Sequence, residues 1–334
     1  MLKSFFPLVL PARSKVDLLS FSKKTPKFSP SRKSGASEKA FEENALFNQE
    51  GRFDSAFRKA KNAGVNVDFY KKSRQCKLPK IDGEVLFGTH PVLEMLRSGR
   101  RSVHCVYSKD PNTMNTDIKE ICAQRSISIK SSTTKQLDNL AEYQLHNGIC
   151  ADVSPLPIES LSTEIVGSSQ KAAYLYLDGI LDPGNIGAIV RSATFFGANG
   201  IVWAASKGPK RLTSSMSKAS SGALEHFPVF CVESITEMYE LLRPLQFSFI
   251  GTVDEEAAAR KGIQTQTLAN CKISPRSVII MGHEQKGIAD EYLKLCDTLV
   301  TIPRSDKYRS SSVASLNVSV ATGLLLHQWS SRDS

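Results

Sequence analysis

Three short polar clusters in the second half of the chain hold residue types that could bind an anionic substrate and act on it. They are LDPGNIGAIVRS (181–192), MGHEQKG (281–287) and RSDKYRSSSVASLNVS (304–319), and each follows an apolar run. The clusters supply a guanidinium at Arg191, a carboxylate at Glu284, and side-chain amides at Asn185 and Asn317. A positioned guanidinium can stabilise negative charge that develops during a reaction. We therefore treat the three clusters together as the candidate site.

Taken singly, each cluster also has an ordinary structural interpretation. Asn185 can be the N-cap of a helix that begins near it, Arg191 a solvated helix charge, and Glu284 a cap in a strand-to-helix loop. Gly187 lies one turn before Arg191 and leaves room where a substrate could approach. A dinucleotide site is disfavoured, because Gly-x-Gly-x-x-Gly is absent and no acidic residue lies about 20 residues further on.

Five apolar runs alternate with helical patterns in the second half of the chain. The predicted strands are 174–180, 200–206, 247–253, 277–282 and 298–303. This alternation, with nearly continuous apolar strands, predicts a parallel sheet covered by helices on both faces. Ligands of such sheets lie beyond the carboxyl ends of the strands, which is where the three clusters fall.

The last helical pattern is apolar after Val318 and polar at its entrance, at Ser315, Asn317 and Ser319. One of these residues can be the N-cap of a buried helix. The other two need partners, or the entrance of the helix must bind something.

The composition divides the chain into four predicted regions. Residues 1–37 form a basic leader, and residues 38–80 a helical region that ends in a basic linker. Residues 81–158 form a small α/β domain with a helix ending at Gly99. A polar linker at 159–171 leads to the domain of the parallel sheet at 171–330.

Positive charge is concentrated at the start of the chain. Residues 1–80 contain 18 Lys and Arg against 7 Asp and Glu, whereas residues 81–334 contain 25 against 26. The body is therefore nearly neutral, so any RNA-binding surface must be local. Residues 1–37 are basic, rich in Ser and poor in acids, which is typical of organelle transit peptides; a disordered basic arm is the alternative.

Several classes of protein are disfavoured by composition. The seven cysteines are scattered without a Cys-x-x-Cys pair, and the histidines show no metal-ligand spacing. A disulfide framework or a zinc site is therefore not expected, and a reducing compartment is. No charge-free apolar run reaches about 18 residues, so we expect no membrane span.

The order and content of the clusters resemble the motifs of SpoU/TrmH-type RNA 2′-O-ribose methyltransferases, a family of the knotted SPOUT class. The first family motif, Asn followed six residues later by Arg, is matched by Asn185 and Arg191. The second, Gly-x-Glu-x-x-Gly, is matched by Gly282, Glu284 and Gly287. The third, Ile-Pro followed by Ser-Leu-Asn-Val-Ser, is matched by Ile302, Pro303 and residues 315–319. The stretch SKASSGALEHFPV (217–229) resembles the family sequence between the first two motifs.

The resemblance covers roughly residues 84–330 and implies an α/β fold. It implies a trefoil-knotted SPOUT parallel-sheet catalytic domain, preceded by a small α/β substrate-binding domain that resembles a ribosomal protein. S-adenosylmethionine is expected to bind in the knot at Gly282, Ile302 and Leu316. The implied catalytic residues are Arg191, Asn185, Glu284, Ser315 and Asn317. A homodimer is also implied, with residues of both subunits at each site, and no metal is required.

The role of Arg191 stays open between two possibilities. The family account makes it the base that removes the proton from the ribose 2′-hydroxyl. A guanidinium holds its proton too tightly to be an ordinary base. Arg191 would otherwise stabilise the developing alkoxide or bind the adjacent phosphate.

RNA contacts are expected in two basic loops near the site. The predicted RNA-binding residues are Lys207, Lys210, Arg211, Lys218, Arg304, Lys307 and Arg309. Cations beside hydroxyl groups suit phosphate and ribose contacts, and Tyr308 could stack on an unpaired base; a solvated charged loop is the alternative. The family reaches Ser-Leu-Asn sooner after the proline, so the longer loop here puts its path over the cofactor in doubt.

With its basic leader, the chain is similar to the mitochondrial branch of the family. We therefore expect a methyltransferase of the mitochondrial matrix that modifies a guanosine ribose of large-subunit (16S-type) rRNA, alone or in a ribosome precursor. Two alternatives remain, namely the same chemistry on a tRNA, and a non-catalytic RNA-binding assembly factor. The presence of all the motif residues speaks against the second.

Overall fold

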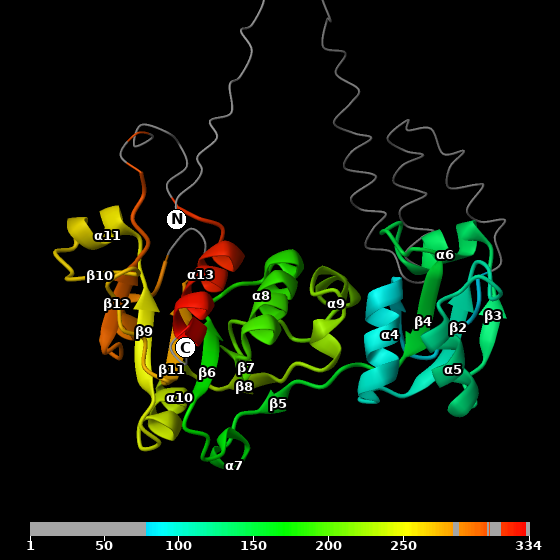
Figure 1. Ribbon diagram of the computed structural model, residues 1–334, viewed down its shortest axis with the longest axis horizontal. Helices are drawn as coiled ribbons and strands as arrows, with labels where there is room; N and C mark the ends of the chain where they lie inside the picture. The colour runs from blue at the N-terminus through cyan, green and yellow to red at the C-terminus, as the bar shows by residue number, and fades with distance from the viewer. Residues whose placement is uncertain (1–77, 283–286, 306, 308–314, 332–334) are drawn as a thin grey trace, which may run out of the picture.

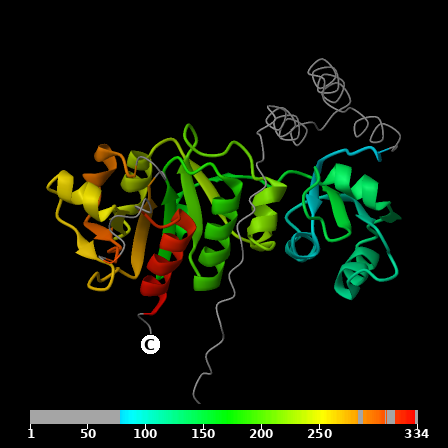
Figure 2. The same ribbon diagram turned by 90° about the horizontal axis from the view of Figure 1, so that it is seen from above.

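The computed structural model describes residues 78–282, 287–305, 307 and 315–331, so the predicted leader and almost all of region 38–80 lie outside it. The described chain forms two sheets that lie side by side (Figures 1 and 2). The smaller sheet contains, in spatial order, β1 (Glu84–Phe87), β4 (Ile149–Val153), β2 (Val103–Ser108) and β3 (Ile129–Ser131). The larger sheet contains, in spatial order, β10 (Gln266–Thr267), β12 (Thr298–Thr301), β9 (Ser248–Thr252), β11 (Arg276–Met281), β6 (Ala172–Leu177), β7 (Gly200–Ala204), β8 (Val229–Val232) and β5 (Glu159–Ser160).

Every strand pair described in the larger sheet is parallel, as predicted. The five predicted strands are observed as β6, β7, β9, β11 and β12, with ends that differ by up to three residues. β8, β5 and β10 were not predicted. They have four, two and two residues, too short for an apolar run to stand out from the neighbouring loops.

Helices cover both faces of the larger sheet, because successive strand residues point to opposite sides. In β6, Leu175 packs into the core cluster of one face, and Tyr174 and Tyr176 pack into that of the other. The first face carries α8 (Pro183–Phe196), α9 (Ser214–Ala219), the 3₁₀ turn η1 (Ala223–Glu225) and α13 (Val318–Ser330). The second face carries α7 (Thr163–Val166), α10 (Ile235–Leu242) and α12 (Asp290–Leu293), while α11 (Glu255–Arg260) follows β9.

The C-terminal helix α13 packs against α8 (Figure 1), although the strand before it, β12, lies near the other end of the sheet. The chain therefore returns past β9 and β11 after it leaves β12. Contacts with residues before β6 and β11 hold the end of α13 in this position. The indole Nε1 of Trp329 donates to the carbonyl of Pro275 at 3.0 Å, and Lys171 Nζ donates to the carbonyl of Ser330 at 3.2 Å.

The smaller sheet packs with α4 (Thr89–Ser98), α5 (Thr116–Gln124) and α6 (Thr134–Leu140). α4 ends at Gly99 with φ 65°, which confirms the predicted stop. α6 was not predicted, and it begins at a capping box made by Thr133 and Gln136. Residues 159–171, predicted to be a linker, contain β5 and α7 and so extend the larger sheet.

Membrane spans and metal clusters are both absent from the described residues. Among them, no helix combines the length and the apolar character needed to cross a membrane. No group of three or more His, Cys, Asp or Glu side chains in these same residues could hold a metal ion.

Candidate active site

Asn185 and Asn317 are far apart in the sequence, yet their side chains form a hydrogen bond. Nδ2 of Asn317 donates to Oδ1 of Asn185 at 2.9 Å. Asn185 lies in the first turn of α8, where its backbone N–H donates to the carboxylate of Asp182 at 2.7 Å. Asp182 is therefore the N-cap, and the alternative in which Asn185 caps the helix is wrong. The side chain of Asn185 instead meets the start of α13.

Asn317 also caps α13, which explains part of the polar entrance of this helix. Its Oδ1 accepts hydrogen bonds from the backbone N–H of Ser319 at 2.9 Å and from the hydroxyl of Ser319 at 2.6 Å. One amide thus supports its own helix through oxygen and contacts α8 through nitrogen. Ser315 and Leu316 precede this cap and are exposed.

Arg191 is exposed on α8, and its Nη1 donates to the hydroxyl of Ser221 at 3.0 Å. Ser221 and Gly222 both have positive φ, 56° and 88°, in the turn that follows α9. This conformation is uncommon for a serine. The turn therefore presents a hydroxyl to the guanidinium at a position fixed by the backbone.

The sequence suggested that Gly187 leaves an open space one turn before Arg191, and this is wrong. A Cβ there would lie 2.5 Å from the Cβ of Ala219 and 2.5 Å from the carbonyl oxygen of Met216. Both residues belong to α9, so the missing side chain lets α8 and α9 approach closely. This contact places the turn after α9 beside Arg191.

Gly282 and Ile302, predicted to bind the cofactor, directly follow β11 and β12 at the carboxyl edge of the sheet. A Cβ at Gly282 would lie 2.5 Å from the carbonyl carbon of Gly287, so the missing side chain lets the protein's own backbone approach closely. Gly287 has φ 67°, a backbone conformation that favours glycine. Beside Ile302, the buried hydroxyl of Thr301 has no hydrogen-bond partner among the described residues. Glu284 lies outside these residues.

Lys207 is held at the end of β6 by two neighbours. Its Nζ donates to the hydroxyl of Tyr292 at 2.5 Å and lies 3.4 Å from Oδ1 of Asp178, the residue that follows β6. The hydrogen bond with Tyr292, aided by the charge of Asp178, raises the pKa of Lys207. This ammonium therefore stays charged and is positioned at the carboxyl edge of the sheet.

Three more predicted RNA-binding cations lie in the segment between β7 and η1. Lys210 and Arg211 are exposed, and Lys210 Nζ donates to the carbonyl of Ala205. The smaller sheet with its helices (β1 to β4) is called the smaller unit below, and the larger sheet with its helices (β5 to α13) the larger unit. Lys218 Nζ of the larger unit donates to Oδ1 of Asn147 in the smaller unit at 2.6 Å. Burial there lowers the pKa of Lys218. Of these three, Lys210 and Arg211 are the ones that face solvent.

The last predicted cations belong to the loop after β12. Arg304 forms an ion pair with Glu256 of α11 at 2.8 Å, which ties the start of this loop to its neighbour. Lys307 is exposed, and Arg309 lies outside the described residues. The described cations therefore fall into three groups: Lys207, Lys210 and Arg211 in the segment after β7, Lys218 at the contact with the smaller unit, and Arg304 and Lys307 after β12.

The sequence did not predict a hollow of about 450 Å³ in the smaller unit. It is lined by Leu78, Pro79, Lys80, Tyr107, Lys130, Ser131, Ser132 and Gln136. Burial raises the pKa of Tyr107 to about 12, so its phenol stays protonated near neutral pH. The residues that line this hollow are spread over more than fifty positions of the sequence, so no local pattern could have indicated the hollow.

Two family models match the chain. The SpoU rRNA methylase family model matches residues 172–327, and the model for RNA 2′-O ribose methyltransferase substrate binding matches residues 85–158. The first match covers the larger sheet and its helices except β5 and α7, and the second covers the smaller sheet and its helices.

Curated relatives resemble the chain over most of its length. The mitochondrial rRNA methyltransferase 1 of Homo sapiens is 31% identical over 255 residues, which cover 73% of this chain and 71% of the relative. The protein of the same name in Schizosaccharomyces pombe is 29% identical over 283 residues, covering 76% and 92%. The 23S rRNA (guanosine-2′-O-)-methyltransferase RlmB of Pseudomonas syringae is 30% identical over 252 residues, covering 73% and 94%.

Solved structures share the fold. The SpoU methyltransferase AviRb of Streptomyces viridochromogenes, in complex with AdoMet, superposes with a TM-score of 0.61 at 18% identity and covers 90% of this chain and 98% of its own. An RNA 2′-O ribose methyltransferase superposes with a TM-score of 0.58 at 20% identity, covering 73% and 86%.

Proposed function

The chain belongs to the SpoU family of rRNA methylases, and from this premise we propose that it methylates the 2′-oxygen of a guanosine ribose in large-subunit rRNA. The observation that carries the proposal is the hydrogen bond between Asn185 and Asn317. It joins the residues that match the first and third family motifs, one from each of two helices. Gly282 and Ile302 lie at the same edge of the sheet. These motif residues therefore come from four elements, which are α8, α13 and the carboxyl ends of β11 and β12.

The cofactor of the reaction is S-adenosylmethionine, which supplies an electrophilic methyl group from its sulfonium. The carboxyl edge of β11 and β12 fits such a molecule in two ways. The backbone of Gly287 fills the space of a side chain at Gly282, so the peptide groups of these two residues are what this turn offers a ligand. The buried hydroxyl of Thr301 has no described partner and could serve a polar ligand. We assign Gly282, Ile302 and Leu316 to cofactor binding.

Arg191 acts as an electrostatic residue in this proposal rather than as the base. Its guanidinium is exposed and donates to a neutral hydroxyl, and guanidinium groups in general hold their proton too tightly to act as ordinary bases. It would bind the 2′-oxygen or the adjacent phosphate while the hydroxyl proton leaves to solvent. Asn185, Asn317, Ser315 and Glu284 would position the groups around it.

The trefoil knot and the homodimer belong to the same proposal. The return of α13 across the sheet to α8 supports the knot. An exposed apolar stripe on and just before α13 supports the dimer, with Leu316 48%, Val320 51% and Leu324 42% exposed. Phe195 of α8 is 82% exposed. A second copy of this chain, placed on the stripe, would remove these side chains from water.

We place the reaction in the mitochondrial matrix, on rRNA or on an assembling ribosomal particle. The two mitochondrial relatives and the basic composition of residues 1–37 support this location. We assign the phosphate contacts to the cations that the sequence indicated. They are Lys207, Lys210, Arg211, Lys218, Arg304, Lys307 and Arg309.

The test uses the chain from Ser37 onward with labelled S-adenosylmethionine. Unmodified mitochondrial large-subunit rRNA, an assembling particle and a tRNA pool are offered separately, and the label is mapped by resistance of the 3′ phosphodiester to alkali. Label at one guanosine of the rRNA, free or in the particle, is expected. Label only in tRNA would overturn the substrate, and RNA binding without any transfer would favour an assembly factor.

A further inference from the structure

A buried ion pair joins the smaller unit to the larger one. Arg101 lies in the loop between α4 and β2, and Glu225 ends η1 of the larger unit. Both side chains are 0% exposed. Nε of Arg101 donates to Oε2 of Glu225 at 2.7 Å, and Nη2 donates to Oε1 at 3.1 Å. The pair is therefore bidentate, the geometry that gives a guanidinium–carboxylate contact its directional specificity.

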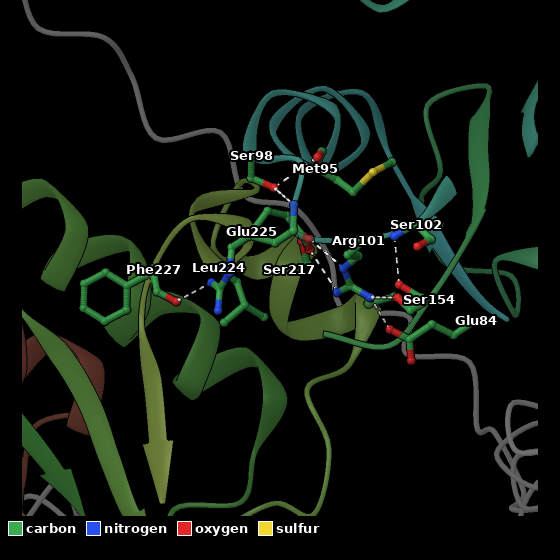
Figure 3. A network of polar contacts seen from close by, with 12 residues as sticks. Glu84, Met95, Ser98, Arg101, Ser102, Ser154, Ser217, Leu224, Glu225 and Phe227 are labelled. Carbon is green, nitrogen blue, oxygen red and sulfur yellow. Dashed lines mark hydrogen bonds and ion pairs between the residues drawn. The ribbon is translucent and has the colours of Figure 1, made fainter. Parts of the chain in front are cut away.

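Arg101 and Glu225 each also form hydrogen bonds within their own unit (Figure 3). Nη1 of Arg101 donates to the carboxylate of Glu84 and, at 3.0 Å, to the carbonyl of Ser154. On the other side, the hydroxyl of Ser217 in α9 donates to Oε1 of Glu225 at 2.7 Å. The remaining nitrogens of Arg101 are thus aimed across the interface, and the orientation of one unit relative to the other is fixed.

The turn that receives Arg191 lies between this ion pair and the site. Ser221, which accepts from Arg191, and Gly222 immediately precede η1. A Cβ at Gly222 would lie 2.9 Å from the Cβ of Glu94 in α4, so the smaller unit also touches this turn directly. Within this turn, Ser221 therefore contacts Arg191 of the site, and Gly222 contacts α4 of the smaller unit.

We propose that the Arg101–Glu225 pair is a positioning contact: by docking the smaller unit on η1 it fixes the turn at Ser221 and hence the guanidinium of Arg191. The inference rests on the proposed methyl transfer. It makes Arg101, 90 residues before Arg191 in the sequence, necessary for the rate of transfer and not for cofactor binding. Small displacements of a catalytic group lower rates strongly, because the reacting atoms must be aligned.

The experiment compares full-length variants. Arg101→Met removes one charge; the double variant Arg101→Met with Glu225→Leu removes both, which avoids an unpaired buried charge and so preserves folding. Lys135→Met is the matched control, because Lys135 is an exposed cation in the first turn of α6 in the smaller unit. We measure kcat, cofactor affinity by calorimetry, and the relative position of the units by small-angle X-ray scattering.

Both Arg101 variants are expected to lower kcat at least tenfold, with cofactor affinity within twofold of the wild type and an expanded scattering profile. The control is expected to match the wild type in all three. A double variant with full kcat, or an unchanged scattering profile in both variants, would overturn the inference. A wild-type chain that binds cofactor but transfers no methyl group would contradict the proposed function instead, and the scattering comparison would still decide whether the pair docks the units.

Discussion

Arg191 is the residue on which the proposed chemistry depends most. It is exposed, and its guanidinium donates to the hydroxyl of Ser221. We predict that Arg191→Ala lowers kcat by at least about 10²-fold, the usual effect of removing a positioned group that stabilises developing charge. Cofactor affinity and dimerisation should change little, because Arg191 belongs neither to the residues assigned to the cofactor nor to the exposed apolar side chains proposed to pack in the dimer. Steady-state kinetics measures kcat, and calorimetry measures cofactor affinity. Retained turnover in Arg191→Ala would show that Arg191 does not stabilise the developing charge.

Asn317 has two separable functions. Asn317→Ala removes the cap of α13 and the hydrogen bond with Asn185, and should lower the free energy of unfolding by about 1 kcal/mol. Asn317→Ser keeps a capping oxygen but is too short to reach Asn185. We expect Asn317→Ser to unfold close to the wild type in urea yet to lose methyl transfer. Equal activity of Asn317→Ser and wild type would show that the hydrogen bond with Asn185 is dispensable.

At the residue scale, spacing in the sequence indicated Asn185, Arg191 and Asn317 as a group. It could not indicate their partners, because these come from distant segments. Ser221 contacts Arg191 through a left-handed turn whose geometry depends on the end of α9. Arg101 belongs to no motif, and Glu225 lies in the stretch 217–229 that resembles the family, but nothing in either segment indicates that the two residues pair across the units.

At the scale of elements, the contact between α8 and α9 positions the site and depends on Gly187. We predict that Gly187→Ala destabilises the protein by about 1–3 kcal/mol, because its Cβ would overlap the backbone of α9. The control is Gly323→Ala in α13, where the nearest atom to a Cβ is Ser192 Oγ at 3.9 Å. There alanine should stabilise by up to about 1 kcal/mol. Thermal unfolding measures both, and equal effects of the two changes would contradict this role of Gly187.

Periodicity predicted the parallel sheet and its five main strands, since these are continuous apolar runs. It did not predict β5 or α7, because the polar residues 159–171 give no periodic signal and gain their structure from pairing with β8. The sequence prediction also placed the start of α8 near Asn185, whereas the helix starts at Pro183. Asp182 and Pro183 together mark that start, as an N-cap and a proline in the first turn do in other helices.

At the scale of the whole molecule, the exposed stripe of α13 predicts a homodimer. Val320→Glu with Leu324→Glu should give a monomer in analytical ultracentrifugation, because charges there cannot be buried against a second copy. Leu145→Glu with Ile165→Glu changes two exposed apolar residues away from α13 and should leave the dimer intact. A wild-type chain that sediments as a monomer would overturn the dimer.

The neutral body of the chain predicts that RNA binding depends on a few local cations. Lys210→Ala with Arg211→Ala should weaken rRNA binding and reduce the dependence of log K on log salt concentration by about 0.7–0.9 for each phosphate that the protein no longer neutralises. Lys272→Ala with Lys294→Ala removes two exposed cations that precede β11 and β12, at the opposite edge of the sheet, and should leave the slope unchanged. An unchanged slope for Lys210→Ala with Arg211→Ala would mean that the RNA binds to another surface of the protein.

The proposed product is a 2′-O-methylguanosine in large-subunit rRNA, and its most direct measurement is mass spectrometry of that rRNA digested to nucleosides and mapped fragments. The rRNA would come from mitochondria of cells that lack the protein and of the same cells supplied with the wild type or with Arg191→Ala. We predict one guanosine that carries the methyl group only when the wild type is present. A methylation pattern that is the same in all three cell lines would contradict the proposed function.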